Sequence, residues 1–239
     1  KMEAESRHLV VGLGNPGLKY EQTFHNCGWL GIDALTEATG IRLNRQKFQG
    51  IYGSGEWQGK RLYLLKPLTF MNLSGDCVRP IADYFKIPTS NIAVLYDDID
   101  IELGRLRIRE KGGSGTHNGM KSVIARLGDE NFPRFRIGIG PKPKEWDMIS
   151  YVLAKIPPDK QMALDDVMID LVDGVKLWLK RDIQFAMNRI NTRRNKKIEE
   201  TKKTESITSL KSIQTEQGTA LKNSDKVGND SETNGSDRF

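Results

Sequence analysis

Short apolar runs alternate with amphipathic segments between residues 8 and 190. Runs such as HLVVGL (His8 to Leu13) and IAVLY (Ile92 to Tyr96) have the length and continuous apolar character of buried strands. The segments between them carry apolar residues at intervals of three and four, as amphipathic helices do. This alternation predicts one α/β domain with a twisted, mixed and mostly parallel sheet flanked by helices.

Turn and cap residues set the limits of these elements. The pattern predicts helices over 26–39, 74–85, 118–127 and 159–190, and strands over 8–13, 51–57, 61–65, 92–96, 104–109 and 134–139. Gly40 and Gly128 stand at helix ends, where glycine is common, and Ser74 is expected to cap the second helix. We expect the strand at 92–96 to end at the acidic cluster Asp97, Asp98 and Asp100.

The C-terminal part of the chain has a different composition. Hydrophobic residues make up 37% of the 239 residues, which is low for a globular domain. Residues 192–239 are mainly Lys, Glu, Ser, Thr, Asn and Gln, and they bury too little apolar surface to offset the entropy of the chain. We therefore expect a folded domain over 1–191 and a disordered polar tail over 192–239.

Charge, cysteine content and hydropathy narrow the class of protein. A formal net charge of +6 permits a polyanionic partner, although many metabolic enzymes carry as much. The two cysteines, Cys27 and Cys77, lack the spacing of a zinc site or a disulfide framework. No apolar run has the length of a signal peptide or a membrane span, so we expect a soluble, cytoplasmic protein without a membrane partner.

The turn after the first strand, Gly12 to Gly17, matches the pattern G-x-G-x-x-G of dinucleotide-binding proteins. Pro16 removes a backbone N–H that a pyrophosphate would need, and no acidic residue ends a strand about twenty residues later. The turn also presents Asn15, whose amide both donates and accepts hydrogen bonds. A nucleotide-dependent oxidoreductase therefore stays as a minor alternative.

His25 and Asp97 are the candidate acid–base residues. An imidazole titrates near neutral pH, so His25 can act as a general base on water, although a helix-capping role is the alternative. Asp97 follows a central strand and is placed to orient such an imidazole. The acidic cluster of Asp97, Asp98 and Asp100 could instead bind magnesium, but no Walker-type loop accompanies it, and we predict no metal.

Three asparagines stand at strand-to-helix junctions, where side chains of an α/β sheet converge on one crevice. They are Asn15, Asn72 and Asn118. Singly each is typical of a turn or a helix cap. Together with His25 and Asp97 they suit a site that binds a polar acyl group and stabilises an oxyanion without a covalent nucleophile.

Four runs of the chain, in this order, closely resemble the bacterial-type peptidyl-tRNA hydrolase family: GLGNPGLKYEQTFHNCG, KPLTFMNLSG, YDDIDIELGRLRIREKGGSGTHNG and FPRFRIGIG. The resemblance covers roughly Leu9 to Ile190. It implies an esterase that uses water to cleave peptide from tRNA in peptidyl-tRNA and so recycles tRNA from stalled translation. It also implies a monomer that needs no cofactor.

The resemblance assigns roles to individual residues. His25 matches the proton acceptor, Asp97 matches the aspartate that stabilises it, and Asn15 matches the residue that helps to distinguish N-blocked substrates. Other positions match contacts to the tRNA end or the peptide, namely Tyr20, Phe70, Asn72 and Asn118. Arg107, Arg109 and Arg136 fall where relatives carry basic residues that face tRNA.

Three positions depart from the family pattern. Phe24 stands where arginine is usual, Tyr96 where histidine is frequent, and Thr116 where glycine is usual. None replaces a residue assigned to catalysis. We expect Phe24 to change the shape or charge of the crevice entrance, and Thr116 to stiffen a loop. A non-catalytic RNA-binding relative of the family is the alternative function.

Overall fold

Seven strands form one mixed sheet in the computed structural model, which describes residues 6–193. They are β1 (Arg7–Gly12), β2 (Arg45–Lys47), β3 (Gly50–Trp57), β4 (Lys60–Pro67), β5 (Ile92–Glu102), β6 (Leu106–Arg109) and β7 (Arg134–Gly140), in the order β2-β3-β4-β1-β5-β7-β6. The four central strands, β4, β1, β5 and β7, are parallel, and antiparallel strands extend both edges. The predicted α/β fold with a mixed sheet is confirmed.

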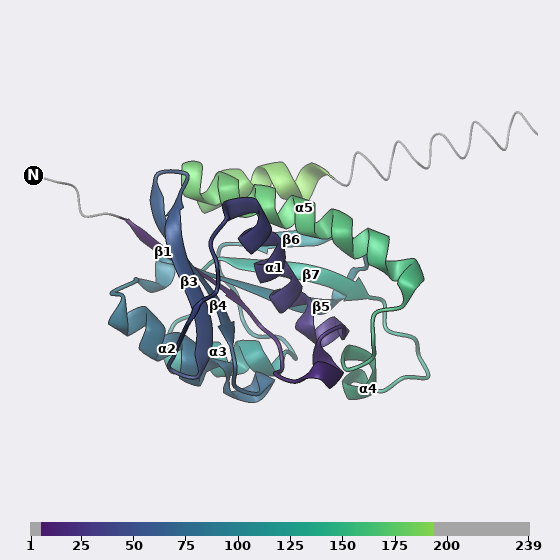
Figure 1. The fold of residues 1–239 in the computed structure, drawn as a ribbon. Helices are drawn as coiled ribbons and strands as arrows, with labels where there is room; N and C mark the ends of the chain where they lie inside the picture. Colours follow the sequence, from purple (N-terminus) through teal and green to yellow (C-terminus); the bar gives the residue numbers. More distant parts are fainter. Residues whose placement is uncertain (1–5, 194–239) are drawn as a thin grey trace, which may run out of the picture. The chain divides into compact units, whose positions relative to one another are not determined.

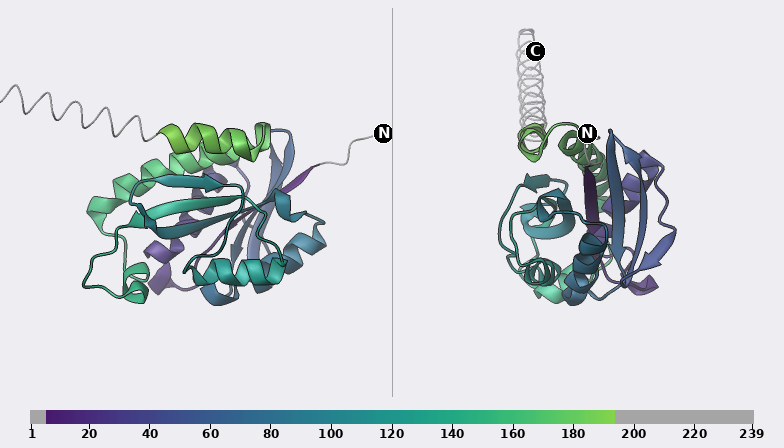
Figure 2. Two further views of the ribbon diagram at one scale, coloured as in Figure 1. Left: turned by 180° about the vertical axis from the view of Figure 1, so that it is seen from behind. Right: turned by 90° about the vertical axis from the view of Figure 1, so that its left-hand side faces the viewer.

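Helices cover both faces of this sheet (Figure 1; two further views in Figure 2). On one face lie α1 (Cys27–Thr39) and α5 (Pro158–Lys180), and on the other α2 (Ser74–Tyr84) and α3 (Asn118–Leu127). Shorter elements are α4 (Met148–Val152) and the 3₁₀ turns η1 (Leu18–Tyr20), η2 (Phe24–Asn26), η3 (Met71–Leu73) and η4 (Thr89–Asn91). None of the helices within residues 6–193 has the length and apolar character needed to cross a bilayer.

The central strands are apolar on both sides because each face is covered. In β1, Val10 packs into the cluster that contains α1 and α5, whereas Leu9 and Val11 pack into the cluster that contains α2 and α3. Successive side chains of a strand point to opposite faces, so a strand between two helical layers has no polar side. This accounts for the continuous apolar runs in the sequence.

Two glycines bring the start of α1 against the sheet. A Cβ on Gly12 of β1 would lie 2.1 Å from the carbonyl oxygen of Gly28, and a Cβ on Gly28 would lie 2.4 Å from the backbone nitrogen of Leu13. The Cβ on Gly28 would also lie 2.4 Å from the carbonyl oxygen of Leu95 in β5. Only glycine permits this approach, which places the residues just before α1 beside the ends of β1 and β5.

Three local predictions are wrong. Ser74 is the first residue of α2 rather than its cap, and its hydroxyl donates to the carbonyl of Met71. The strand that begins at Ile92 continues to Glu102, because pairing with β7 extends beyond the acidic residues. The segment 159–190 is not one helix: α5 ends at Lys180, and a last helix starts at residue 183.

The last described helix, residues 183–193, packs on the core and hydrogen-bonds the edge of the sheet through the side chain of Asn191. The Asn191 amide accepts a hydrogen bond from the backbone N–H of Ile108 at 2.9 Å and donates one to the Ile108 carbonyl at 3.0 Å. Ile108 lies on the edge strand β6. Of the predicted tail, 192–239, all but the first two residues lie outside the described part of the chain.

We expect Gly28→Ala to destabilise the protein by about 1–3 kcal/mol, because the added methyl group overpacks a backbone-to-backbone contact. Thermal unfolding measures the effect. Gly113→Ala is the matched control, since a Cβ there meets no atom within 4 Å. Equal unfolding temperatures for the two variants would contradict the close approach of α1 to the sheet.

Candidate active site

A cleft of about 630 Å³ opens beyond the ends of β1 and β4 and along the carboxyl half of β5. Eight of the ten predicted site residues line it: Asn15, His25, Phe70, Asn72, Asp97, Arg109, Asn118 and Arg136. They come from the turn after β1, from η2, from the segment after β4, from the three strands β5, β6 and β7, and from the start of α3. The carboxyl ends of parallel strands are the usual position for a site in an open α/β sheet.

His25 and Asp97 form the buried centre of the cleft. His25 belongs to η2, and its Nδ1 lies 3.0 Å from both carboxylate oxygens of Asp97 in β5. The side chains are 12% and 2% exposed. Since an ionised carboxylate only accepts hydrogen bonds, Nδ1 carries the hydrogen, and Nε2 is the nitrogen left to take a proton from water.

A second histidine contacts the same carboxylate, and sequence reasoning missed it. The Nε2 of His117 lies 3.1 Å from Oδ1 of Asp97, and its Nδ1 accepts the backbone N–H of Met120 at 3.2 Å. His117 is thus the side-chain cap of α3. The only sequence signal was its place directly before Asn118 at a helix start.

Asp97 and His25 shift each other's pKa. Burial alone would raise the pKa of Asp97, but the two imidazoles, through their charge and hydrogen bonds, hold it well below its ordinary value. Burial alone would lower the pKa of His25, but the charge of Asp97 and its hydrogen bond outweigh this and raise the pKa above 6.5. The pair therefore favours ionised Asp97 and a basic His25.

Asn15 is fixed by three hydrogen bonds to two residues. The side chain of Asn26 accepts from the backbone N–H of Asn15 at 2.9 Å and donates to its carbonyl at 3.0 Å. The Asn15 side-chain oxygen accepts the backbone N–H of Met71 at 2.8 Å. This leaves the NH₂ group of Asn15 for the cleft, where it can donate to a carbonyl oxygen or an oxyanion. Asn26, which is fully buried, is another residue that sequence reasoning missed.

The turn after β1 is not built to hold a dinucleotide. The N–H of Leu13 donates to Leu95, the N–H of Asn15 donates to Asn26, and Pro16 has none. A pyrophosphate needs free backbone donors at this position. Two backbone donors of the turn are therefore engaged and a third is missing, which disfavours the oxidoreductase alternative.

The acidic cluster does not converge on one point either. Asp98 accepts from Nε of Arg136 at 2.6 Å and from the backbone N–H of Asp100, while Asp97 faces the two histidines. The nearest group with metal-ligand spacing is His25, Asp97 and His117, whose atoms lie within 4.8 Å of one another. Both imidazoles hydrogen-bond the carboxylate directly, so the trio forms a hydrogen-bonded unit rather than an open set of ligands.

Neither cysteine is suited to act as a nucleophile. Burial, reinforced by the charge of Asp97, raises the pKa of Cys27 well above its ordinary value, and burial raises the pKa of Cys77 to about 12. A thiol must ionise to attack. A thiol nucleophile is therefore disfavoured, and the Nε2 of His25 is a group in the cleft that can accept a proton from water.

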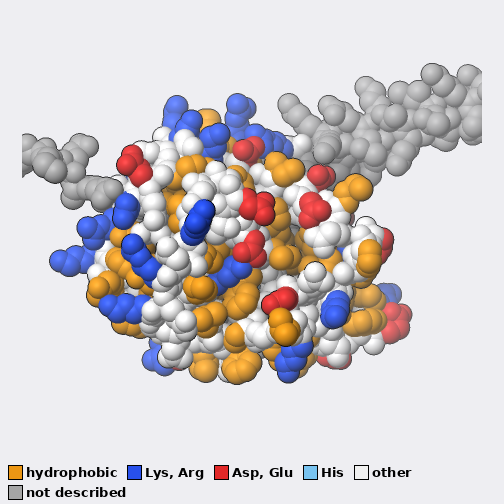
Figure 3. All heavy atoms as spheres, viewed as in Figure 1, with side chains coloured by type: hydrophobic (Ala, Val, Ile, Leu, Met, Phe, Trp, Pro, Cys, Tyr) orange, Lys and Arg blue, Asp and Glu red, His pale blue; other side chains and the backbone are white. Residues whose placement is uncertain are grey.

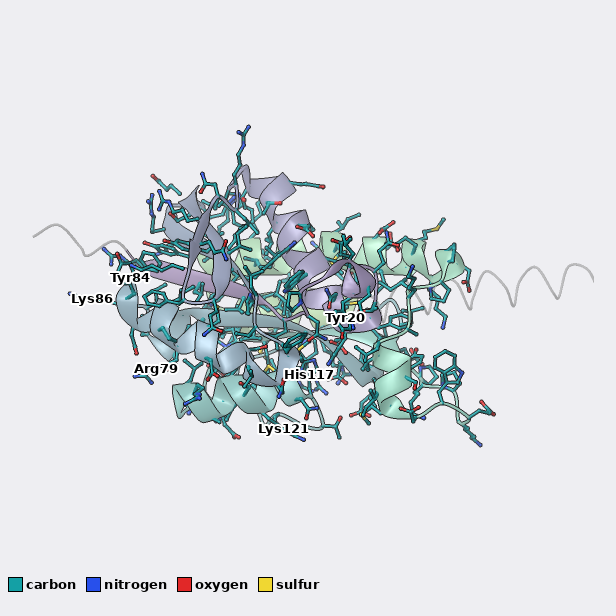
Figure 4. The ribbon with its side chains drawn as sticks, turned by 60° about the horizontal axis from the view of Figure 1, so that its bottom comes forward. Tyr20, Arg79, Tyr84, Lys86, His117 and Lys121 are labelled. Carbon is teal, nitrogen blue, oxygen red and sulfur yellow. The ribbon has the colours of Figure 1, made fainter. Side chains whose placement is uncertain are left out.

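The residues predicted to contact RNA or peptide divide into two groups. Phe70 is 56% exposed at the cleft, and Arg109 also lines it. Tyr20, whose ring lies 4.8 Å from Nζ of Lys19, is absent from the lining among the described residues, as is Arg107, which is exposed on β6. Figure 4 shows the side of the molecule on which both Tyr20 and His117 are visible.

Exposed positive charge also occurs away from the predicted arginines. Lys and Arg side chains gather on the side of the sheet that carries β3 and α2 (Figure 3). The edge strand β2 exposes all three of its residues, Arg45, Gln46 and Lys47. Charged side chains on an edge strand oppose its pairing with other chains, so this group has a structural explanation of its own.

The three departures from the family pattern have different positions. Phe24 is 1% exposed and stacks on Tyr151 of α4 with ring centroids 5.1 Å apart, so it lies behind the cleft wall and not in its lining, and its effect on the crevice entrance stays a prediction. Tyr96 lines the cleft with its ring 5.0 Å from that of His117. Thr116 is exposed in the loop that precedes His117.

The fold and the site define an α/β protein with a buried His–Asp pair at the carboxyl end of its sheet. The profile of the family described as Peptidyl-tRNA hydrolase matches residues 9–200. The chain belongs to the peptidyl-tRNA hydrolase family, which confirms the resemblance.

Individual relatives align with this chain over most of their own length. The peptidyl-tRNA hydrolase of Clostridium novyi (strain NT) is 45% identical over 183 residues, which cover 77% of this chain and 97% of that protein. The enzyme of Symbiobacterium thermophilum is 47% identical over 186 residues, 77% and 98% of the two chains. The crystal structure of peptidyl-tRNA hydrolase from Acinetobacter baumannii superposes with a TM-score of 0.74 at 37% identity, over 80% and 97%.

A histidine that acts as a general base must be unprotonated, and Asp97 raises the pKa of His25, so we expect kcat/KM to fall on the acid side through a midpoint above 6.5. Asp97→Asn removes the negative charge that raises the pKa of His25, whereas burial of His25 still lowers that pKa. The midpoint should therefore move to lower pH, and the rate should fall at every pH. A pH series of kcat/KM for both proteins measures this. An unmoved midpoint in Asp97→Asn would contradict the pairing.

Proposed function

We propose that this protein hydrolyses the ester bond between the peptide and the terminal ribose in peptidyl-tRNA and releases free tRNA. Membership of the peptidyl-tRNA hydrolase family supports the reaction and the substrate. The observation that carries the mechanism is the 3.0 Å contact from Nδ1 of His25 to Asp97, which leaves Nε2 for the asparagine-lined cleft.

The reaction proceeds by general-base catalysis. Nε2 of His25 takes a proton from water, and the oxygen of that water attacks the ester carbonyl, while ionised Asp97 stabilises the imidazolium. The NH₂ group of Asn15 is available for the developing oxyanion, and Asn72 and Asn118 are available to orient the acyl chain. When the tetrahedral intermediate collapses, the ribose oxygen leaves and receives the proton from His25.

Other parts of the proposal concern the tRNA and the state of the protein. Phe70 and Tyr20 are proposed to contact the tRNA end or the peptide, and Arg107, Arg109 and Arg136 its phosphates. We further propose a catalytic domain over 1–191 that acts as a monomer in the cytoplasm without a cofactor. These assignments rest on the family match and on exposed or cleft-lining positions.

The alternative of a non-catalytic RNA-binding relative has no support. The relatives described above carry the name of the enzyme. A scaffold that only binds RNA has no physical need for a buried carboxylate paired to an imidazole at the base of a cleft. Cleavage of peptidyl-tRNA by the purified protein decides between the two.

We expect His25→Ala to lose roughly a hundredfold or more in kcat, since that is the usual contribution of a general base. Its affinity for tRNA should stay close to that of the wild type. The measurement is hydrolysis of a purified N-acetyl-aminoacyl-tRNA, with tRNA binding measured in parallel. His8→Gln is the matched control, because His8 lies at the opposite end of β1. Equal turnover by His25→Ala and the wild type would refute the assignment.

We expect the same hydrolysis to continue at an unchanged rate after treatment with a chelator. His25, Asp97 and His117 satisfy one another by hydrogen bonds, so the proposed water activation needs no bound cation. The assay is run with and without EDTA, and then with EDTA followed by excess zinc or magnesium. Loss of activity that a metal restores would contradict this mechanism.

A further inference from the structure

His117 is a nearly buried imidazole that the proposed reaction does not use as acid or base. Its side chain is 8% exposed, and its ring centroid lies 4.9 Å from that of His25. Its Nε2 lies 3.1 Å from Oδ1 of Asp97, an oxygen that is also 3.0 Å from Nδ1 of His25. Two imidazoles therefore share one oxygen of one carboxylate.

The helix that follows fixes the direction of this second hydrogen bond. The backbone N–H of Met120 donates to the lone pair of Nδ1 of His117, so Nδ1 carries no hydrogen and the ring hydrogen is on Nε2. Nε2 therefore donates to Asp97. The ring is also held from the side, because Tyr96 packs edge-on against it with centroids 5.0 Å apart.

A second donor changes how Asp97 acts on His25. A carboxylate that is already stabilised by one N–H attracts a proton on a neighbouring imidazole less strongly than an otherwise unpaired carboxylate does. This matters because a base that is already protonated cannot take a proton from water. Without the donor from His117, the charge of Asp97 would act on His25 alone.

We propose that His117 is a positioning residue that divides Asp97 between two imidazoles and so keeps His25 unprotonated near neutral pH. The proposal rests on the proposed function of His25 as general base, and it deepens that function by naming the group that adjusts its basicity. His117 acts through Asp97 rather than on the substrate.

Other charged or titratable groups surround His25, but within residues 6–193 only the two imidazoles hydrogen-bond Asp97. Asp98 and Arg136 pair with each other, and the Cys27 thiol lies fully buried behind the site. The remaining groups of this kind line the cleft from β5 to β7 and from the glycine-rich loop: Tyr96, Asp100, Arg109, Lys111 and Arg134. None of these bonds the Asp97 carboxylate, so removal of His117 isolates one donor.

Two variants separate the donor from the volume of the ring. His117→Phe keeps an aromatic ring and removes the donor, whereas His117→Gln keeps an N–H donor on a flexible side chain. The titration midpoint of His25 is followed by NMR in the full chain without substrate, so this answer does not depend on peptidyl-tRNA cleavage. Thermal unfolding of each variant is measured in parallel, and His117→Ala replaces His117→Phe if the latter does not fold.

We expect His117→Phe to raise the midpoint of His25 by about 0.5–1 pH unit, and His117→Gln to stay closer to the wild type. In kcat/KM the Phe variant should then lose about threefold to tenfold on the acid side of the midpoint, with a smaller loss at high pH. A merely structural role would lower activity equally at all pH values.

Three results would overturn the proposal: an unmoved or lowered midpoint in His117→Phe, an equal shift in His117→Gln, or a loss of activity that does not depend on pH. Failure of the proposed function looks different. In that case the wild type cleaves no peptidyl-tRNA, while the NMR midpoints still report whether His117 acts on His25 through Asp97.

Discussion

A single buried carboxylate organises the active end of the sheet. Asp97 is 2% exposed on a strand between two others, where an ionised group is costly unless hydrogen bonds compensate it. One compensating imidazole, His25, comes from the layer that contains α1, and the other, His117, comes from the layer that contains α3. The same contacts that make burial of Asp97 tolerable therefore join the two helical layers and create a base.

The fold could be predicted from the sequence because hydrophobic periodicity and turn signals depend on residues that are neighbours in the chain. The runs at 8–13 and 92–96 and the helix ends at Gly40 and Gly128 follow from rules on neighbouring residues. The break between Lys180 and residue 183 was missed because apolar spacing continues across it. The extension of β5 was missed because acidic residues indicate a turn, whereas the Asp98–Arg136 pair satisfies one of them within the sheet.

The site was predicted in part for a similar reason. His25 and the three asparagines lie close to the ends of helices and strands, and the topology of a parallel sheet brings such ends together. Asp97 lies within β5, two residues beyond the last residue that pairs with β1. The roles of His117 and Asn26 depend on distances between residues that no spacing rule connects. Tyr20 came from family resemblance alone, and the lining of the cleft includes neither Tyr20 nor Arg107. Contacts such as those of His117 and Asn26 depend on tertiary packing, and no spacing pattern in a single sequence indicates them.

The amide of Asn191 has a consequence for the solubility of shortened forms of this chain. It occupies both backbone groups of Ile108 on the outermost strand, β6, as a neighbouring strand would. A form cut before residue 183 would present that strand as an unpaired hydrogen-bonding edge, which favours self-association. The C-terminal limit of a soluble fragment is therefore set by the protection of this edge and by the core residues Ile183, Ala186 and Ile190, and not by the residues that line the cleft.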